Sequence, residues 1–213
     1  MRFPRFYLIS DRHRMGKDPV ATLQGLANHG LPAFQWREKD LPPVENHQIL
    51  SKLTEGVASH PTRILVNDRV DLAAALRIGV QLPEDGLPTH VARRLLAPDA
   101  WIGRSTHSVA SARTARDEGV DFVTLGPIYD TPSKREYGAP LGIEVLREAA
   151  RDLEGFRIIA IGGITPERVA ECLEAGASGV AAIRAVWDAP DPVQAWLAFA
   201  RALRIPTLPA PAP

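Results

Sequence analysis

Gln35, Arg37 and Lys39 alternate along one short segment, with Glu38 between the two cations. Alternate residues of an extended strand point to the same side, so these three side chains are expected to face one way and Glu38 the other. Two cations and an amide on one side suit a phosphate or a carboxylate. A solvated strand end with an internal Glu38 ion pair is the other interpretation.

A single histidine is a candidate for proton transfer. His107 lies in the segment GRSTHS at 103–108, two residues after Ser105. Imidazole titrates near neutral pH and can act as a general acid or base. The alternative is that His107 has only a capping or structural role.

Two later loops carry groups that suit an anion. The long loop GPIYDTPSKREYG at 126–138 contains Thr131, Ser133 and Lys134, and long polar loops often cover a substrate or are simply flexible. The adjacent glycines Gly162 and Gly163 precede an expected helix start, where backbone N–H groups can hold a phosphate. Tight packing is the other reason for two adjacent glycines.

Short apolar runs, each followed by a stretch with helical spacing, predict eight βα units. The expected strands are 6–10, 33–37, 63–67, 79–82, 101–104, 122–125, 157–161 and 179–183. The expected helices include 19–28, 44–58, 109–118, 143–152, 166–175 and 192–203. This pattern predicts an α/β fold, a single (β/α)8 TIM barrel whose chemistry lies at the carboxyl ends of the strands. A doubly wound sheet would place a glycine-rich loop after the first strand, where this chain has SDRH.

The helix limits carry recognisable signals. Ser108 and Thr165 are expected to cap helices, and Gly30, Gly119 and Gly176 to end them in the left-handed conformation. The barrel is expected to be one domain over residues 1–204. The proline-rich residues 205–213 are expected to form a disordered tail.

Composition excludes several classes of partner. Lys and Arg together number 25, as do Asp and Glu, so no basic field exists for nucleic acid or an anionic membrane. The single Cys172 cannot form an internal disulfide, and the apolar run at the N-terminus is too short for a signal peptide or a membrane span. A cytoplasmic protein is expected.

Several ordered segments together resemble the thiamine phosphate synthase and TenI superfamily. They are YLISDR at 7–12, QWREKD at 35–40, NDRVDLA at 67–73, STHS at 105–108, GPIYDTPSK at 126–134 and AIGGI at 160–164. The resemblance implies a barrel enzyme of thiamine biosynthesis that takes a small-molecule thiazole phosphate. It also implies a dimer or another small homo-oligomer.

The synthases of this superfamily join hydroxymethylpyrimidine pyrophosphate to thiazole phosphate with the help of Mg²⁺. The resemblance makes Gln35, Arg37, Lys39, Asn67 and Lys134 the pyrophosphate cradle. It also adds Ser105, Thr131 and Ser133 as substrate-binding residues.

The same resemblance makes Asp68 one Mg²⁺ ligand. The second acidic ligand follows the fourth strand in synthases, and in the stretch GVQLPEDGLP at 79–88 its position falls on Gly86. Magnesium is usually bound through one or two carboxylates plus phosphates, so this loss is expected to weaken the site, unless Asp85 takes the position.

The segments VQLP at 80–83 and IGRS at 102–105 look more like the TenI branch. The leading expectation is therefore a metal-free thiazole tautomerase with His107 and Lys134 as catalytic residues. Its phosphate would be held by Gly162, Gly163, Ile183 and Arg184. Thiamine phosphate synthase is the alternative, and a non-catalytic regulator that binds a phosphate ligand is the second alternative.

Overall fold

The eight strands close into one parallel barrel in chain order. The computed structural model describes residues 3–131 and 138–208. The strands are β1 (Phe6–Ile9), β2 (Ala33–Trp36), β3 (Arg63–Asn67), β4 (Gly79–Leu82), β5 (Ile102–Thr106), β6 (Phe122–Leu125), β7 (Ile158–Ala160) and β8 (Gly179–Ala182). The predicted barrel is confirmed. β3, β4 and β6 have the expected limits, and the limits of the other strands differ from the expected ones by one or two residues.

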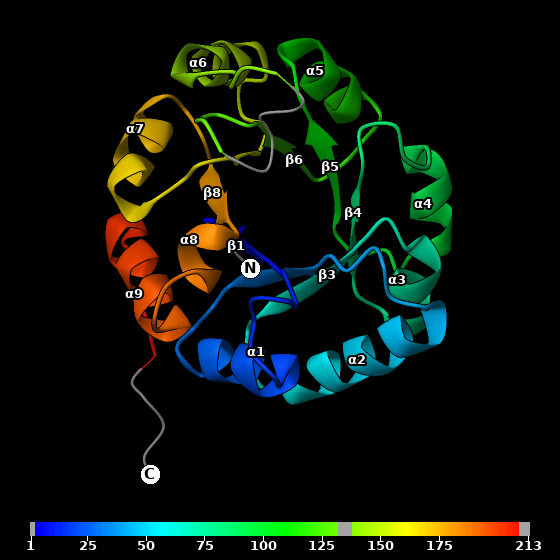
Figure 1. Ribbon diagram of the computed structural model, residues 1–213. Helices are drawn as coiled ribbons and strands as arrows, with labels where there is room; N and C mark the ends of the chain where they lie inside the picture. The colour runs from blue at the N-terminus through cyan, green and yellow to red at the C-terminus, as the bar shows by residue number, and fades with distance from the viewer. Residues whose placement is uncertain (1–2, 132–137, 209–213) are drawn as a thin grey trace.

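The helices form a ring around the strands (Figure 1). They are α1 (Pro19–Asn28), α2 (Pro43–Gly56), α3 (Val70–Leu76), α4 (Thr89–Leu95), α5 (Val109–Asp117), α6 (Ile143–Asp152), α7 (Val169–Glu174), α8 (Arg184–Trp187) and α9 (Pro192–Leu203). A 3₁₀ turn, Pro166–Arg168, precedes α7 where one continuous helix is expected. Figure 1 shows the short α8 inside the ring of helices, beside β8 and β1.

Two apolar cores hold the barrel together. The larger core lies between strands and helices, and its fully buried side chains include Trp36, Phe34 and Trp196. A smaller core, with Tyr7 and Phe122, fills the barrel interior. Both faces of every strand are thus covered, which explains the nearly continuous apolar runs in the sequence.

The expected helix limits are mostly confirmed. The Ser108 side chain accepts a hydrogen bond from the Ser111 N–H at 3.0 Å, within a capping box. Gly30, Gly119 and Gly176 have φ values of 81°, 85° and 101°, the left-handed conformation that ends helices. The expected Thr165 cap is wrong, because its side chain forms no capping hydrogen bond.

The residues after α9 follow the barrel surface. The Ile205 N–H donates to the Ala200 carbonyl at 2.9 Å, and Ile205 packs against the main core. The Leu208 nitrogen lies 3.4 Å from the position that a Cβ atom would take at Gly30. The division into a barrel domain over 1–204 and a disordered tail stays a prediction. No helix in residues 3–131 and 138–208 is long and apolar enough to cross a membrane.

Candidate active site at the carboxyl ends of the strands

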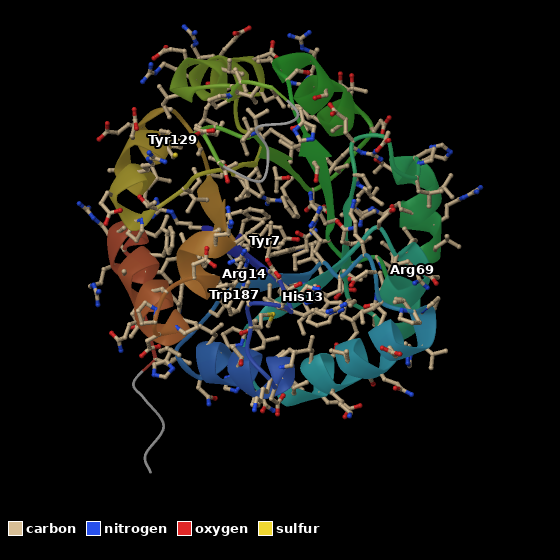
Figure 2. The ribbon with its side chains drawn as sticks, viewed as in Figure 1. Tyr7, His13, Arg14, Arg69, Tyr129 and Trp187 are labelled. Carbon is tan, nitrogen blue, oxygen red and sulfur yellow. The ribbon has the colours of Figure 1, made fainter. Side chains whose placement is uncertain are left out.

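The carboxyl ends of all eight strands meet at one end of the barrel, which we call the mouth. The sequence-predicted residues of the described chain lie in the last residues of these strands or in the segments directly after them, so the fold gathers them around one opening. In Figure 2, Tyr7, Arg14 and Trp187 lie near the centre of the ring, whereas Arg69 and Tyr129 lie out beside α3 and α7.

A polar layer lies inside the barrel below the mouth. The Tyr7 hydroxyl donates to Gln81 Oε1 at 3.4 Å, and the Gln81 amide donates to Ser105 Oγ and Thr124 Oγ1, both at 3.3 Å. Burial raises the pKa of Tyr7 well above its usual value, so the phenol stays a neutral donor. Among these residues the sequence predicts only Ser105. Tyr7, Gln81 and Thr124 sit inside apolar runs, and only strand alternation could have found them.

The end of β2 carries polar groups that have no partner in the described chain. The Gln35 residue is 2% exposed, and its side-chain amide makes no hydrogen bond within residues 3–131 and 138–208. Arg37 and Lys39 are exposed and have no ion pair with any residue of those same ranges. Donors that are left free in this way can bind an anionic ligand.

Glu38 turns away from these donors, as the alternation predicts, and joins the loops after β1 and β2. Its carboxylate accepts hydrogen bonds from the Ser10 hydroxyl and, at 3.0 Å, from the Arg12 backbone N–H. Ser10 Oγ in turn accepts from the Arg37 N–H at 2.8 Å. Burial raises the pKa of Glu38, opposed by the hydrogen bonds from Ser10 and Arg12 and by the Arg12 charge. The Glu38 ion pair is therefore with Arg12, and it leaves Arg37 and Lys39 free.

The end of β3 lies beside the end of β2. Trp36 is level with Val66, so the register places Asn67 level with Arg37. Asp68 is exposed and has φ 61°, an uncommon conformation for a residue other than glycine. Its N–H donates to the Gln81 carbonyl at 2.9 Å, which ties the turn after β3 to β4. Asn67 and Asp68 thus follow the free donors of β2 around the mouth.

A tight turn follows β4. The Gly86 N–H donates to the Pro83 carbonyl at 3.2 Å, and a Cβ atom at Gly86 would lie 2.6 Å from the Pro83 ring. The turn therefore has no room for the acidic residue that the synthase pattern places at position 86. Asp85, the expected substitute, is exposed in the same turn.

His107 follows β5. Its Nδ1 lies 2.6 Å from the Gly126 carbonyl, which can only accept, so Nδ1 carries the proton. In the neutral ring, Nε2 is then the basic nitrogen. Nε2 lies 4.0 Å from a Glu84 carboxylate oxygen, and the imidazole side chain is 51% exposed. This geometry leaves Nε2 available for proton transfer, while capping of α5 is done by Ser108.

The loops after β6 and β7 run side by side. The Tyr129 N–H donates to the Gly162 carbonyl at 3.0 Å. A Cβ atom at Gly162 would lie 2.5 Å from Pro127, and one at Gly163 would lie 2.7 Å from the Asp130 carbonyl oxygen. Packing alone therefore requires both glycines, whose φ values are positive. Their N–H groups have no hydrogen-bond acceptor among residues 3–131 and 138–208.

Thr131, in the loop after β6, is partly buried. Ser133 and Lys134 lie outside the described residues, so their predicted roles stay predictions.

Arg184 begins α8, directly after Ile183. Its Nε lies 3.6 Å from the Asp188 carboxylate, and the same carboxylate pairs with Arg14. Arg14 also pairs with Asp11 at 2.9 Å. Arg184 is therefore part of a charge chain that joins the ends of β1 and β8, and it is less free to bind a ligand than Arg37.

Fold and site together define a parallel (β/α)8 barrel with unpaired cationic and amide side chains at its mouth. A family model described as thiamine monophosphate synthase matches residues 6–186. The chain is 43% identical over 191 residues to a putative thiamine-phosphate synthase of Geobacter sulfurreducens, across 87% of this chain and 88% of that protein. It is 40% identical over 202 residues to a thiamine-phosphate synthase of Acidothermus cellulolyticus, across 93% and 94% of the two chains.

A solved structure is similar to this chain as well. Thiamine phosphate pyrophosphorylase from Pyrococcus furiosus has a TM-score of 0.84 and 30% identity to this chain, covering 94% of this chain and 95% of that one. The chain belongs to the thiamine monophosphate synthase family. The resemblance drawn from the sequence motifs and the expectation of a thiamine-biosynthesis enzyme are confirmed. The two sequence relatives are named thiamine-phosphate synthases, so the comparisons support the synthase alternative rather than the tautomerase that we expected first.

Proposed function

We propose that this chain is a thiamine phosphate synthase, which joins hydroxymethylpyrimidine pyrophosphate to thiazole phosphate. The thiazole nitrogen bonds to the methylene carbon of the pyrimidine, the bond from that carbon to the pyrophosphate oxygen breaks, and pyrophosphate leaves with the electron pair. Negative charge grows on the leaving group, so donors fixed around it lower the barrier. The observation that carries the proposal is the set of unpartnered donors at the ends of β2 and β3.

In this proposal the leaving pyrophosphate lies against Gln35, Arg37, Lys39 and Asn67. The backbone supports this arrangement, because the Ser10 hydroxyl holds the Arg37 N–H and the β2–β3 register brings Asn67 level with Arg37. Lys134, from the loop after β6, is the fifth predicted member of this cradle.

Magnesium fits the mouth only as an ion with few protein ligands. No group of three or more acidic, histidine or cysteine side chains that could hold a metal occurs in residues 3–131 and 138–208. Mg²⁺ commonly keeps several waters and takes one or two carboxylates together with substrate phosphates. The exposed Asp68 and Asp85 can supply such ligands, and the ion would neutralise charge on the pyrophosphate. We therefore propose Asp68 and Asp85 as its protein ligands.

The phosphate of the thiazole substrate is proposed to bind at Gly162, Gly163, Ile183 and Arg184, across the mouth from the pyrophosphate. The unpartnered N–H groups of the two glycines support this placement. A dimer or another small homo-oligomer stays a prediction of the family resemblance, and a cytoplasmic location stays a prediction of the composition and the single cysteine.

The test is a coupled assay of the purified protein with both substrates and Mg²⁺, in which pyrophosphate release and thiamine phosphate are measured. We expect Arg37→Met to raise the KM for the pyrimidine pyrophosphate about 10-fold to 100-fold, because the variant loses a charge-assisted hydrogen bond to this substrate. Lys52→Met, an exposed cation on α2, is the matched control and should leave the KM unchanged. Failure to form thiamine phosphate with Mg²⁺ present would reject the proposal.

One observation favours a second candidate function, thiazole tautomerisation. The accessible Nε2 of His107 can take a proton from carbon and return it elsewhere, and this chemistry needs no metal. Incubation with the thiazole phosphate carboxylate alone, in heavy water with a chelator, separates the two candidates. Aromatisation with incorporation of deuterium would show the tautomerase, and an unchanged substrate would exclude it.

A further inference from the structure

A hollow lies at the end of the barrel opposite the mouth. It measures about 240 Å³, and its lining includes Arg63, Gly79 and Trp101. Arg63 and Gly79 are the first residues of β3 and β4, and Trp101 directly precedes β5. All strands are parallel, so these residues share the amino-terminal end. Most of the remaining lining comes from the last turn of α2 and from the segments that follow α2, α3 and α4. These three helices follow one another around the ring in Figure 1.

Unpaired charged residues line this hollow. Arg63, Arg77, His60 and Asp99 contribute to the lining. Within residues 3–131 and 138–208, none of the four side chains forms an ion pair or a side-chain hydrogen bond. Two guanidinium groups against one carboxylate leave the hollow cationic even when the imidazole is neutral. An unpaired cationic hollow suits an anion.

Arg63 is held in place before any ligand arrives. Its guanidinium carbon lies 4.4 Å from the centroid of the Trp101 ring, and that ring lies 5.1 Å from the ring of Phe3. Arg63 Nε is sealed from solvent without an acceptor, whereas the two terminal nitrogens are not among the sealed atoms. Stacking on the indole therefore fixes the side chain and leaves its terminal N–H groups accessible. A fixed arginine loses little conformational entropy on binding.

The remaining wall offers few other donors. The Thr54 and Thr62 hydroxyls already donate to backbone carbonyls, at 2.8 Å and 2.6 Å. The apolar part of the wall consists of Val57, Ala58, Ile64, Leu65, Ile78 and Ala100. Binding energy for an anionic head must therefore come from Arg63 and Arg77, and the apolar wall suits the body of a small molecule.

We propose that this hollow binds a small phosphorylated metabolite, with the phosphate on Arg63 and Arg77 and the organic body against the apolar wall. The volume supports this size of ligand, because a water molecule takes only about 30 Å³ and a bare phosphate would not fill the space. The hollow is separated from the mouth by the barrel interior. Occupancy at this end should therefore not compete with the substrates of the proposed synthase reaction.

The four tryptophans allow this proposal to be tested with inorganic phosphate as the probe. Nitrogen-15 NMR of the indole groups is recorded during titration with sodium phosphate, and with sodium chloride at equal ionic strength. Trp101 reports on the hollow and Trp187, in α8, on the mouth. The indole groups of Trp36 and Trp196 are hydrogen-bonded elsewhere and serve as references for an intact fold. We expect a saturable shift of the Trp101 signal with phosphate and not with chloride.

Variants separate this end from the mouth. Arg63→Met and Arg77→Met should each weaken the Trp101 response at least about tenfold. Arg94→Met, an exposed cation of α4 outside the lining, should leave it unchanged, and so should Arg37→Met at the mouth. The initial rate of the proposed synthase reaction should be unchanged in Arg77→Met. No phosphate-specific shift of Trp101, or equal weakening by Arg94→Met, would overturn the proposal.

Discussion

Arg104 should be essential for the turn that follows β4. It is 6% exposed and points outward from β5. Its guanidinium donates to the carbonyls of Pro83 and Glu84, both at 3.1 Å, and of Leu87 at 2.7 Å. One side chain therefore fixes the segment that carries Glu84 and Asp85 at the mouth.

The perturbation is Arg104→Met, which keeps an apolar stem and removes every donor. Hydrogen bonds from a charged group contribute about 1.5–3 kcal/mol each. The three contributions do not add in full. Glu84 and Leu87 are exposed, so water can donate hydrogen bonds to their freed carbonyls. Arg104 Nε also has no acceptor, and the nearby Glu118 carboxylate, at 3.4 Å, is 42% exposed and adds little. We expect a net loss of about 3 kcal/mol.

Urea and thermal unfolding measure this loss. For a chain of this size, about 3 kcal/mol corresponds to a decrease in Tm of roughly 6–12 °C. Arg94→Met, on the exposed face of α4, is the control and should stay within about 0.5 kcal/mol of the wild type. Arg104→Met should also weaken the binding of Mg²⁺ in the proposed synthase reaction, because Asp85 loses its fixed position. A stability equal to that of Arg94→Met would refute the role of Arg104 as the anchor of this turn.

His107→Asn should lower any tautomerisation by at least about 10²-fold and leave synthesis of thiamine phosphate largely intact, as measured by the two assays run in parallel. Burial raises the folded-state pKa of Glu38, so its protonated form contributes stability that is present below the ordinary glutamate pKa and lost as pH rises through the raised value. Glu38→Gln should remove this pH dependence from the free energy of unfolding between the ordinary glutamate pKa and the raised value. An unchanged pH dependence would contradict the raised pKa of Glu38. Gly162→Ala should destabilise by about 2–4 kcal/mol in urea unfolding, whereas Gly155→Ala, also at positive φ but with open space around its Cβ position, should cost about 1 kcal/mol.

The barrel was predictable because its signals are local. Gly30 and Gly119 end helices through their own backbone conformation, and Ser108 caps a helix with its own side chain. The limits of the strands depend on pairing with neighbouring strands as well as on local signals. β5 extends to Thr106, two residues past the expected end, because Thr106 pairs in register with Leu125 of β6. That pairing depends on a neighbour in space.

The contacts that shape the mouth could not be predicted, because their partners are distant in the sequence. Arg12 reaches Glu38 across the ends of two strands, and Arg104 reaches the turn at 83–87. The sequence likewise shows only that Gly86 replaces the acidic Mg²⁺ ligand of the synthase pattern. The structure adds the steric reason, since a Cβ atom there would meet the Pro83 ring.

The mouth divides its polar residues into two kinds. One kind already has a partner within the protein, as Glu38 has a hydrogen bond from Ser10 and Arg184 has an ion pair with Asp188, and such groups position the loops. The other kind has no partner in the described chain, as in Gln35 and Arg37, and such groups are available to a substrate. A donor without a protein partner can bond to an anion without first breaking a bond within the protein, and an anion with several acceptor oxygens can accept from more than one such donor. This reasoning ranks Arg37 above Arg184 in the proposed anion site, although both are cationic residues at strand ends.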